Sequence, residues 1–160
     1  MIEINVVCVG KIKEKYWNEA ISEYSKRLSR YCKLSIIEVA DEKTPDNAPE
    51  AIENQIKQKE GERILSKIPD NAHVIALAIN GKKYTSEALS AHVNDLAVSG
   101  KSKISFVIGG SLGLHEDVLK RANEKLSFSD MTFPHQMMRV VLLEQIYRSY
   151  KILSGEPYHK

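Results

Sequence analysis

A glycine-rich loop follows an apolar run in the second half of the chain. Residues 104–108 lead into Gly109-Gly110-Ser111-Leu112-Gly113, and a short helical pattern follows at residues 116–121. Glycines let a backbone come close to a ligand, and ligands collect at the carboxyl ends of parallel strands. The loop has neither the Gly-Lys-Ser/Thr of a phosphate-binding loop nor a dinucleotide fingerprint. It predicts either one wall of a ligand site or a tight turn that binds nothing.

The same loop has the G-x-S-x-G spacing of a hydrolase nucleophile elbow, in the required strand–turn–helix context. Residues for a Ser…Asp…His triad follow in order, namely Asp117 or Asp130 and then His135 or His159. Only 49 residues follow Ser111, which leaves little room for the rest of a hydrolase sheet. A serine hydrolase is therefore the rival enzyme hypothesis.

A polar loop at residues 127–132 precedes a helical pattern that Pro134 opens. Its small side chains and amides suit an adenosine group, although a capping loop without a ligand has the same composition. Within the helix, Arg139 stands alone in an apolar run, four residues after His135 and on the same face. A charge in such a place must be paired or functional. Arg139 is therefore either a site residue or half of an ion pair at a subunit interface.

The chain ends in Tyr158, His159 and Lys160, which combine a stacking ring, an imidazole and a cation. Such groups suit an unstacked RNA base, whereas chain ends are commonly frayed. Basic residues near the N-terminus can contact phosphates or form a solvated helix face; they are Lys11, Lys13, Lys15, Lys26, Arg27, Arg30 and Lys33.

Strands and helices alternate along the whole chain. Strands are predicted at residues 2–9, 34–39, 73–79, 104–108 and 125–128, and helices at 17–31, 50–68, 86–98, 116–121 and 134–153. The turn signal Asn80-Gly81 is expected to end the third strand. This order predicts a single α/β domain, residues 1–160, with a mostly parallel sheet flanked by helices. The last helix is apolar almost all round, so either a partner subunit or the chain's own core covers its second side.

Composition bounds the function further. The chain has 160 residues, a net charge of +2, and 42% hydrophobic and 28% charged residues. So mild a charge means that any RNA contact depends on local basic patches. Cys8 and Cys32 form no disulfide framework or metal-ligand cluster, which favours the reducing cytoplasm. No signal peptide and no membrane span is expected.

Four segments together resemble one known family. They are VGKIKEKYW (residues 9–17), IGGSLGLH (108–115), LSFSDMTFPHQMMRVVLLEQIYR (126–148) and the terminal PYHK. They resemble the ribosomal RNA large-subunit methyltransferase H family, a branch of the SPOUT methyltransferases, and the resemblance covers essentially the whole chain. The long C-terminal segment is the most specific of the four.

The resemblance implies a fold with a C-terminal trefoil knot, contrary to the general rule that chains avoid knots. It also implies a homodimer that uses S-adenosylmethionine, and no metal, to methylate N3 of a pseudouridine in 23S ribosomal RNA of the large subunit. The cofactor residues that it implies are Leu77, Gly109, Leu126, Ser127, Phe128, Ser129, Asp130, Met131 and Thr132.

Methylation at N3 requires a positioned base and the loss of an imide proton. Arg139, Tyr158 and His159 are expected to orient the base as catalytic residues, with the tail supplied by either subunit. The proton acceptor is open among His135, Glu144, His159 and water. A Ser111 hydrolase and a non-catalytic ribosome-binding protein are the competing hypotheses.

Overall fold

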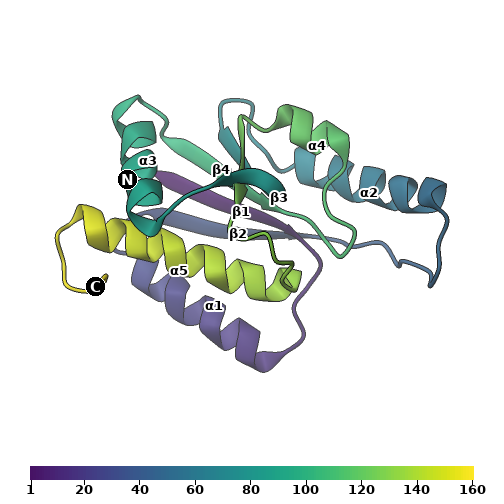
Figure 1. Cartoon of the computed structure of the whole chain (residues 1–160), viewed down its shortest axis with the longest axis horizontal. Coiled ribbons are helices and arrows are strands. Elements are labelled where there is room, and N and C mark those ends of the chain that lie inside the picture. The colour runs from purple at the N-terminus through teal and green to yellow at the C-terminus, as the bar shows by residue number, and fades with distance from the viewer.

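Five parallel strands form the centre of the computed structural model, which describes residues 1–160 (Figure 1). The sheet has the order β2-β1-β4-β3-β5, and each neighbouring pair is parallel. The strands are β1 (Glu3–Val9), β2 (Lys33–Val39), β3 (His73–Lys83), β4 (Lys103–Ile108) and β5 (Glu124–Ser127). The predicted α/β class and parallel sheet are therefore confirmed.

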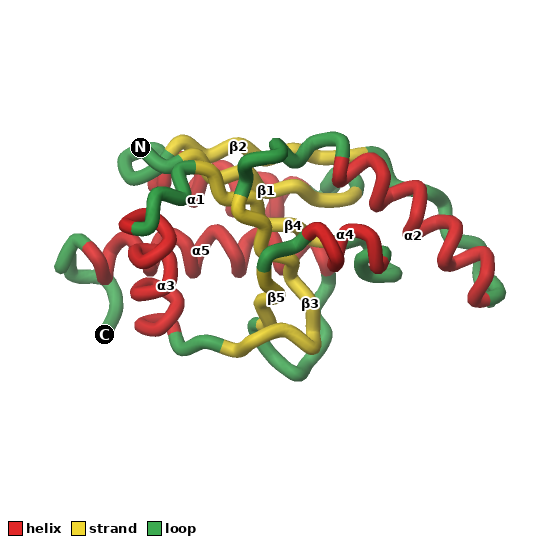
Figure 2. Tube along the Cα trace, turned by 90° about the horizontal axis from the view of Figure 1, so that it is seen from above, coloured by secondary structure: helices red, strands yellow, loops and turns green.

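Helices cover both faces of this sheet (Figures 1 and 2). One face carries α1 (Lys15–Leu28), α3 (Ser86–Val98) and α5 (His135–Leu153), and the other carries α2 (Glu50–Leu65) and α4 (Glu116–Arg121). The alternation of side chains along β1 explains the two layers, because Val6 packs into the first core and Val7 into the second. Thr85 caps α3 as expected, since its Oγ1 accepts a hydrogen bond from the backbone N–H of Ala88 at 3.0 Å.

The third strand differs from the prediction at its end. Asn80-Gly81 is not a turn, because β3 continues to Lys83. Leu126 of β5 is the register partner of both Leu77 and Lys82, so the chain between these two residues crosses over β5. A Cβ atom on Gly81 would lie 2.7 Å from the backbone N and C atoms of Leu126. The glycine is needed here for a close crossing of two backbones.

This crossing carries the chain from β3 to α3, as the curved end of β3 in Figure 1 shows. A trefoil knot requires crossings of this kind, and the knot itself stays a prediction.

The last helix, α5, lies beside α1 and α3 and against the sheet (Figure 1). Leu142, Leu143 and Ile146 are fully buried in this position, whereas Met137 and Val141 keep part of their surface. The apolar side chains of α5 are therefore covered largely by the core of their own chain. No helix combines the length and the apolar character that a membrane crossing requires.

We expect Gly81→Ala to destabilise the fold, because the added methyl group would meet the backbone of Leu126. Overpacking of this kind costs about 1–3 kcal/mol. The matched control is Asn80→Ala, since Asn80 is exposed and makes no side-chain hydrogen bond. Urea unfolding should show a lower midpoint for Gly81→Ala alone, and equal midpoints for the two variants would contradict the crossing.

Candidate active site

A cleft of about 950 Å³ opens at the carboxyl ends of β3, β4 and β5. This volume lies at the upper end of the roughly 300–1,000 Å³ typical of small-molecule sites. Three stretches of chain line it, comprising residues 77–80, residues 108–114, and residues 126–138 in part. The glycine loop and the polar loop, which are far apart in the sequence, therefore face one another across the cleft.

The glycine loop closes tightly on itself. The backbone N–H of Gly113 donates to the carbonyl oxygen of Gly110 at 3.1 Å, and Gly113 has a φ of +87°. A Cβ atom on Gly109 would lie 2.8 Å from the carbonyl carbon of Gly113. Any side chain at Gly109 would therefore push the loop open and move the wall of the cleft.

Glu60 of α2 lies behind the glycine loop and is a residue that the sequence analysis missed. It is buried, and a Cβ atom on Gly110 would lie 3.4 Å from its Oε1. Its Oε2 accepts a hydrogen bond from the backbone N–H of Glu42 at 3.0 Å. Burial raises the pKa of the Glu60 carboxyl. The charged sequence of α2 gives no sign that this particular carboxyl is buried.

The polar loop is held by its own serines. The Ser127 hydroxyl donates to the carbonyl oxygen of Ser129, and the Ser129 hydroxyl accepts from the backbone N–H of Met131, both at 3.0 Å. The backbone N–H groups of Phe128, Ser129 and Thr132 donate to no protein acceptor. The loop thus presents unused donors beside a largely apolar cleft.

The structure brings most of the expected cofactor residues to this cleft. The lining includes Leu77, Gly109, Leu126, Ser127, Phe128, Ser129, Met131 and Thr132. Asp130 is not part of it, because its side chain is 83% exposed and pairs with Lys83.

His135 also lines the cleft, at the first turn of α5. Its Nδ1 atom is buried and has no hydrogen-bond partner. Burial, and then the positive charge of Arg139, lower the pKa of His135 below its usual 6.5. A neutral imidazole therefore lines the cleft, and its Nδ1 is buried without a hydrogen-bond partner.

Arg139 points into the protein and does not line the cleft. Its side chain is almost fully buried, with the residue only 1% exposed. Nη1 donates to Glu38 Oε2 at 2.7 Å, and Nη2 donates to the carbonyl oxygens of Val9 and Gly10 at 2.8 and 2.7 Å. An ion pair is one of the two alternatives for Arg139, but it forms within the chain and not at a subunit interface, and it joins α5 to the ends of β1 and β2.

The C-terminal tail folds back onto α5 and α3. Tyr158 donates to Glu144 Oε2 at 2.6 Å, and His159 contacts Glu87 at 2.6 Å and Arg148 at 3.0 Å. The predicted pair of Glu144 and Arg148 is present at 2.9 Å. The tail therefore lies at the C-terminal end of α5, whereas the cleft lies at its N-terminal end (Figure 1).

No triad forms around Ser111. Its hydroxyl makes no hydrogen bond to any imidazole, and His159 is engaged by Glu87 and Arg148 at the far end of α5. His115 instead caps α4, accepting from the backbone N–H of Asp117 at 3.2 Å. The geometry does not support the hydrolase hypothesis.

Comparisons with known proteins identify the relatives of this chain. A family model described as "Predicted SPOUT methyltransferase" matches residues 2–159. Proteins named "Ribosomal RNA large subunit methyltransferase H" from Clostridium novyi (strain NT) and Bifidobacterium adolescentis are each 65% identical over 159 residues, which cover 99% of this chain and 100% of theirs.

A solved structure supports the fold alone. The "probable methylase family protein" of Haemophilus influenzae Rd KW20 superposes with a TM-score of 0.55 at 13% identity, covering 98% of this chain and 70% of that one. With the family model and full-length relatives of this similarity, the chain belongs to the SPOUT methyltransferase family.

Proposed function

We propose that this protein uses S-adenosylmethionine to methylate N3 of a pseudouridine in the 23S ribosomal RNA of the large subunit. The observation that carries the proposal is the cleft at the carboxyl edge of the sheet, which the glycine loop and residues 126–132 enclose. Family membership and the names of the full-length relatives support the substrate class. Methyl transfer to ribosomal RNA makes the protein an enzyme. Because its substrate is in the ribosome, we place it in the cytoplasm.

The cleft fits the cofactor in shape and chemistry. Apolar side chains such as Leu77, Leu114 and Leu126 line it and suit the faces of an adenine ring. The free N–H groups of Phe128, Ser129 and Thr132 can hydrogen-bond to the ring nitrogens or the ribose. When bound, S-adenosylmethionine supplies an electrophilic methyl group on its sulfonium.

Of the possible proton acceptors, His135 has the most suitable surroundings. Glu144, in the middle of α5, is held by Arg148 and Tyr158, and His159, in the tail, is held by Glu87 and Arg148. His135 lines the cleft with a lowered pKa, and neither of its ring nitrogens is hydrogen-bonded within the protein, so Nε2 is free to accept a proton. We assign it the N3 proton that must leave as the nitrogen–carbon bond forms and the sulfur–carbon bond breaks.

Arg139 acts as a positioning residue in this proposal. Its contacts with Glu38 and with the carbonyl groups of Val9 and Gly10 fix the first turns of α5. His135 lies one turn before it, and the charge of Arg139 helps to keep the imidazole neutral.

A homodimer explains how the tail can take part. A helix of 19 residues such as α5 is about 28 Å long, and the tail contacts it from Glu144 onward, so the first half of the helix separates the tail from the cleft of its own chain. In a two-fold dimer that pairs antiparallel α5 helices, the tail of one subunit meets the cleft of the other. Tyr158 and His159 would then contact the substrate base as catalytic residues.

Local positive charge favours RNA binding at the carboxyl edge of the sheet. Lys11, Lys13 and Lys15 follow the carboxyl end of β1 and are all exposed. They can contact phosphates without a large net charge on the whole protein.

We expect Gly109→Ala to weaken cofactor binding about 10- to 100-fold, because moving the loop by overpacking costs about 1–3 kcal/mol. Methyl transfer to isolated large subunits, followed by nucleoside mass spectrometry, should fall in parallel. The control is Lys101→Ala, at an exposed position outside the cleft, which should keep full activity. Ribosome binding by the wild type without any methyl transfer would favour the non-catalytic hypothesis.

His135→Gln should lower the single-turnover rate by about 10²–10⁴-fold, the range for loss of a general base. In the wild type the lowered pKa keeps the imidazole neutral at pH 7, and the rate should fall only as the pH drops through a value below 6.5. This acidic limb should disappear in His135→Gln. An unchanged rate and pH profile would assign the proton to another acceptor.

Mixed dimers test whether the tail acts on the partner's cleft. With the cofactor held near the wild-type Kd, Gly109→Ala and His159→Ala chains are each expected to show little activity alone. Random re-association of equal amounts should restore about one quarter of wild-type activity, since half of the two-fold dimers are mixed and each has one intact site. A mixture as inactive as its parents would show that the tail does not complement in trans.

A further inference from the structure

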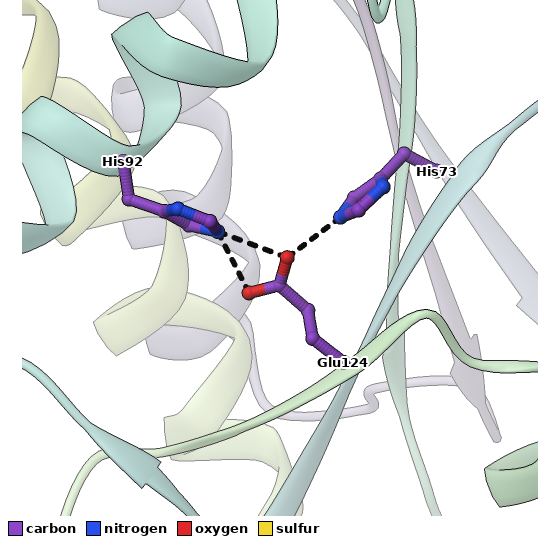
Figure 3. Close-up of side chains that lie close together, drawn as sticks. All are labelled: His73, His92 and Glu124. Carbon is purple, nitrogen blue, oxygen red and sulfur yellow. Dashed lines mark hydrogen bonds and ion pairs between the residues drawn. The ribbon is translucent and has the colours of Figure 1, made fainter.

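Two histidines and a glutamate converge at the opposite edge of the sheet from the cleft (Figure 3). His73 is the first residue of β3, Glu124 is the first residue of β5, and His92 belongs to α3. His73 Nε2 lies 2.6 Å from Glu124 Oε2, and His92 Nε2 lies 2.8 and 2.9 Å from the two carboxylate oxygens. We call these three residues the His–His–Glu cluster.

We propose that the His–His–Glu cluster binds one zinc ion. Two imidazole nitrogens and one carboxylate oxygen are a common protein ligand set for Zn²⁺, with a water in the fourth position. The three candidate ligand atoms all lie within 4.8 Å of one another. Tetrahedral coordination at about 2.0–2.2 Å separates the ligand atoms by about 3.3–3.6 Å, so the Glu124 carboxylate would move away from the two imidazoles to admit the ion.

The tautomers of the histidines permit this coordination. Neither His73 nor His92 uses its Nδ1 atom in a hydrogen bond with the protein. A ring that carries its proton on Nδ1 leaves the Nε2 lone pair for a metal.

The surroundings hold the ligands without closing the site. The side chains of His73, His92 and Glu124 are 13, 25 and 21% exposed. The ring of Tyr84 stacks on His92 with centroids 5.3 Å apart, and Asn123 Oδ1 accepts from the backbone N–H of Val74 at 2.8 Å. These contacts hold the ligand side chains in place while each stays partly exposed to solvent.

Bound zinc would join three elements around the backbone crossing. The chain leaves His73, crosses β5 at Gly81 and returns to His92, while Glu124 begins the strand that is crossed. An ion shared by these residues ties the crossing segment to β5 and stabilises the folded chain, because it binds the native state preferentially. The site lies apart from the cleft, so it is independent of the proposed methyl transfer.

A carboxylate hydrogen-bonded to two histidines without any metal is the alternative, and direct titration distinguishes the two. The probe is ZnCl₂, added in a calorimeter to an untagged full-length chain that has been treated with a chelator. The variants are His92→Gln and Glu124→Gln. The control is His115→Asn, which removes a histidine outside the cluster and keeps a capping side chain on α4.

We expect one zinc ion per chain, and a zinc-dependent rise of the unfolding temperature, in the wild type and in His115→Asn. Loss of a ligand in either cluster variant should weaken binding at least about tenfold, since even outer hydrogen-bond partners contribute that much. Co²⁺ should give a tetrahedral absorption spectrum in the wild type that either cluster variant loses. If circular dichroism shows that His92→Gln does not fold, the zinc titration of Glu124→Gln and the wild-type cobalt spectrum test the proposal instead. No zinc binding by the wild type, or equal binding by all variants, would overturn the proposal.

Discussion

The geometry of the site depends on the hydrogen bonds and the ion pair of the buried Arg139 guanidinium. Arg139 heads the largest fully buried side chains of the protein. Its partners are Glu38 and the carbonyl oxygens of Val9 and Gly10, at the ends of two adjacent strands. Although the Glu38 side chain is 38% exposed, its loss would leave the buried Arg139 charge with carbonyl oxygens as its only partners, which is strongly destabilising. The first turns of α5, and with them His135 and the polar loop, are therefore held against the carboxyl edge of the sheet.

Close backbone approaches complete the site around this anchor. At Gly81 one strand crosses another, and at Gly109 the glycine loop folds onto Gly113, each at a distance that leaves no room for a Cβ atom. The first approach leads the chain across β5 to α3, and the second shapes a wall of the cleft. Both glycines thus serve the same edge of the sheet, where the cleft opens.

The sequence indicates local features well and distant partners poorly. Alternating apolar and helical patterns locate all ten elements, and the two loops of the cleft are recognisable from their composition. Asn80-Gly81 is misread as a turn because the need for its glycine comes from Leu126, which lies far along the chain. The partner of Arg139 lies 101 residues away, so no local pattern reveals that the charge is neutralised inside the chain.

Glu60 and the His–His–Glu cluster escape sequence analysis for a similar reason. Glu60 belongs to a strongly charged helix, and only the packing of the glycine loop against α2 shows that this residue is buried. His73, His92 and Glu124 are separated by intervals that match no metal-binding spacing, and the parallel sheet with α3 brings them together. Long-range packing supplies the information that local periodicity lacks.

The central claim is that the cleft at the carboxyl edge is a cofactor site. Calorimetric titration of the untagged protein with S-adenosylmethionine tests it most directly. The account predicts saturable binding at one site per cleft, in competition with the demethylated product S-adenosylhomocysteine. Absence of any binding heat or competition from a correctly folded protein would contradict the claim, because the unused donors of the polar loop and the apolar lining of the cleft would then have no cofactor to hold.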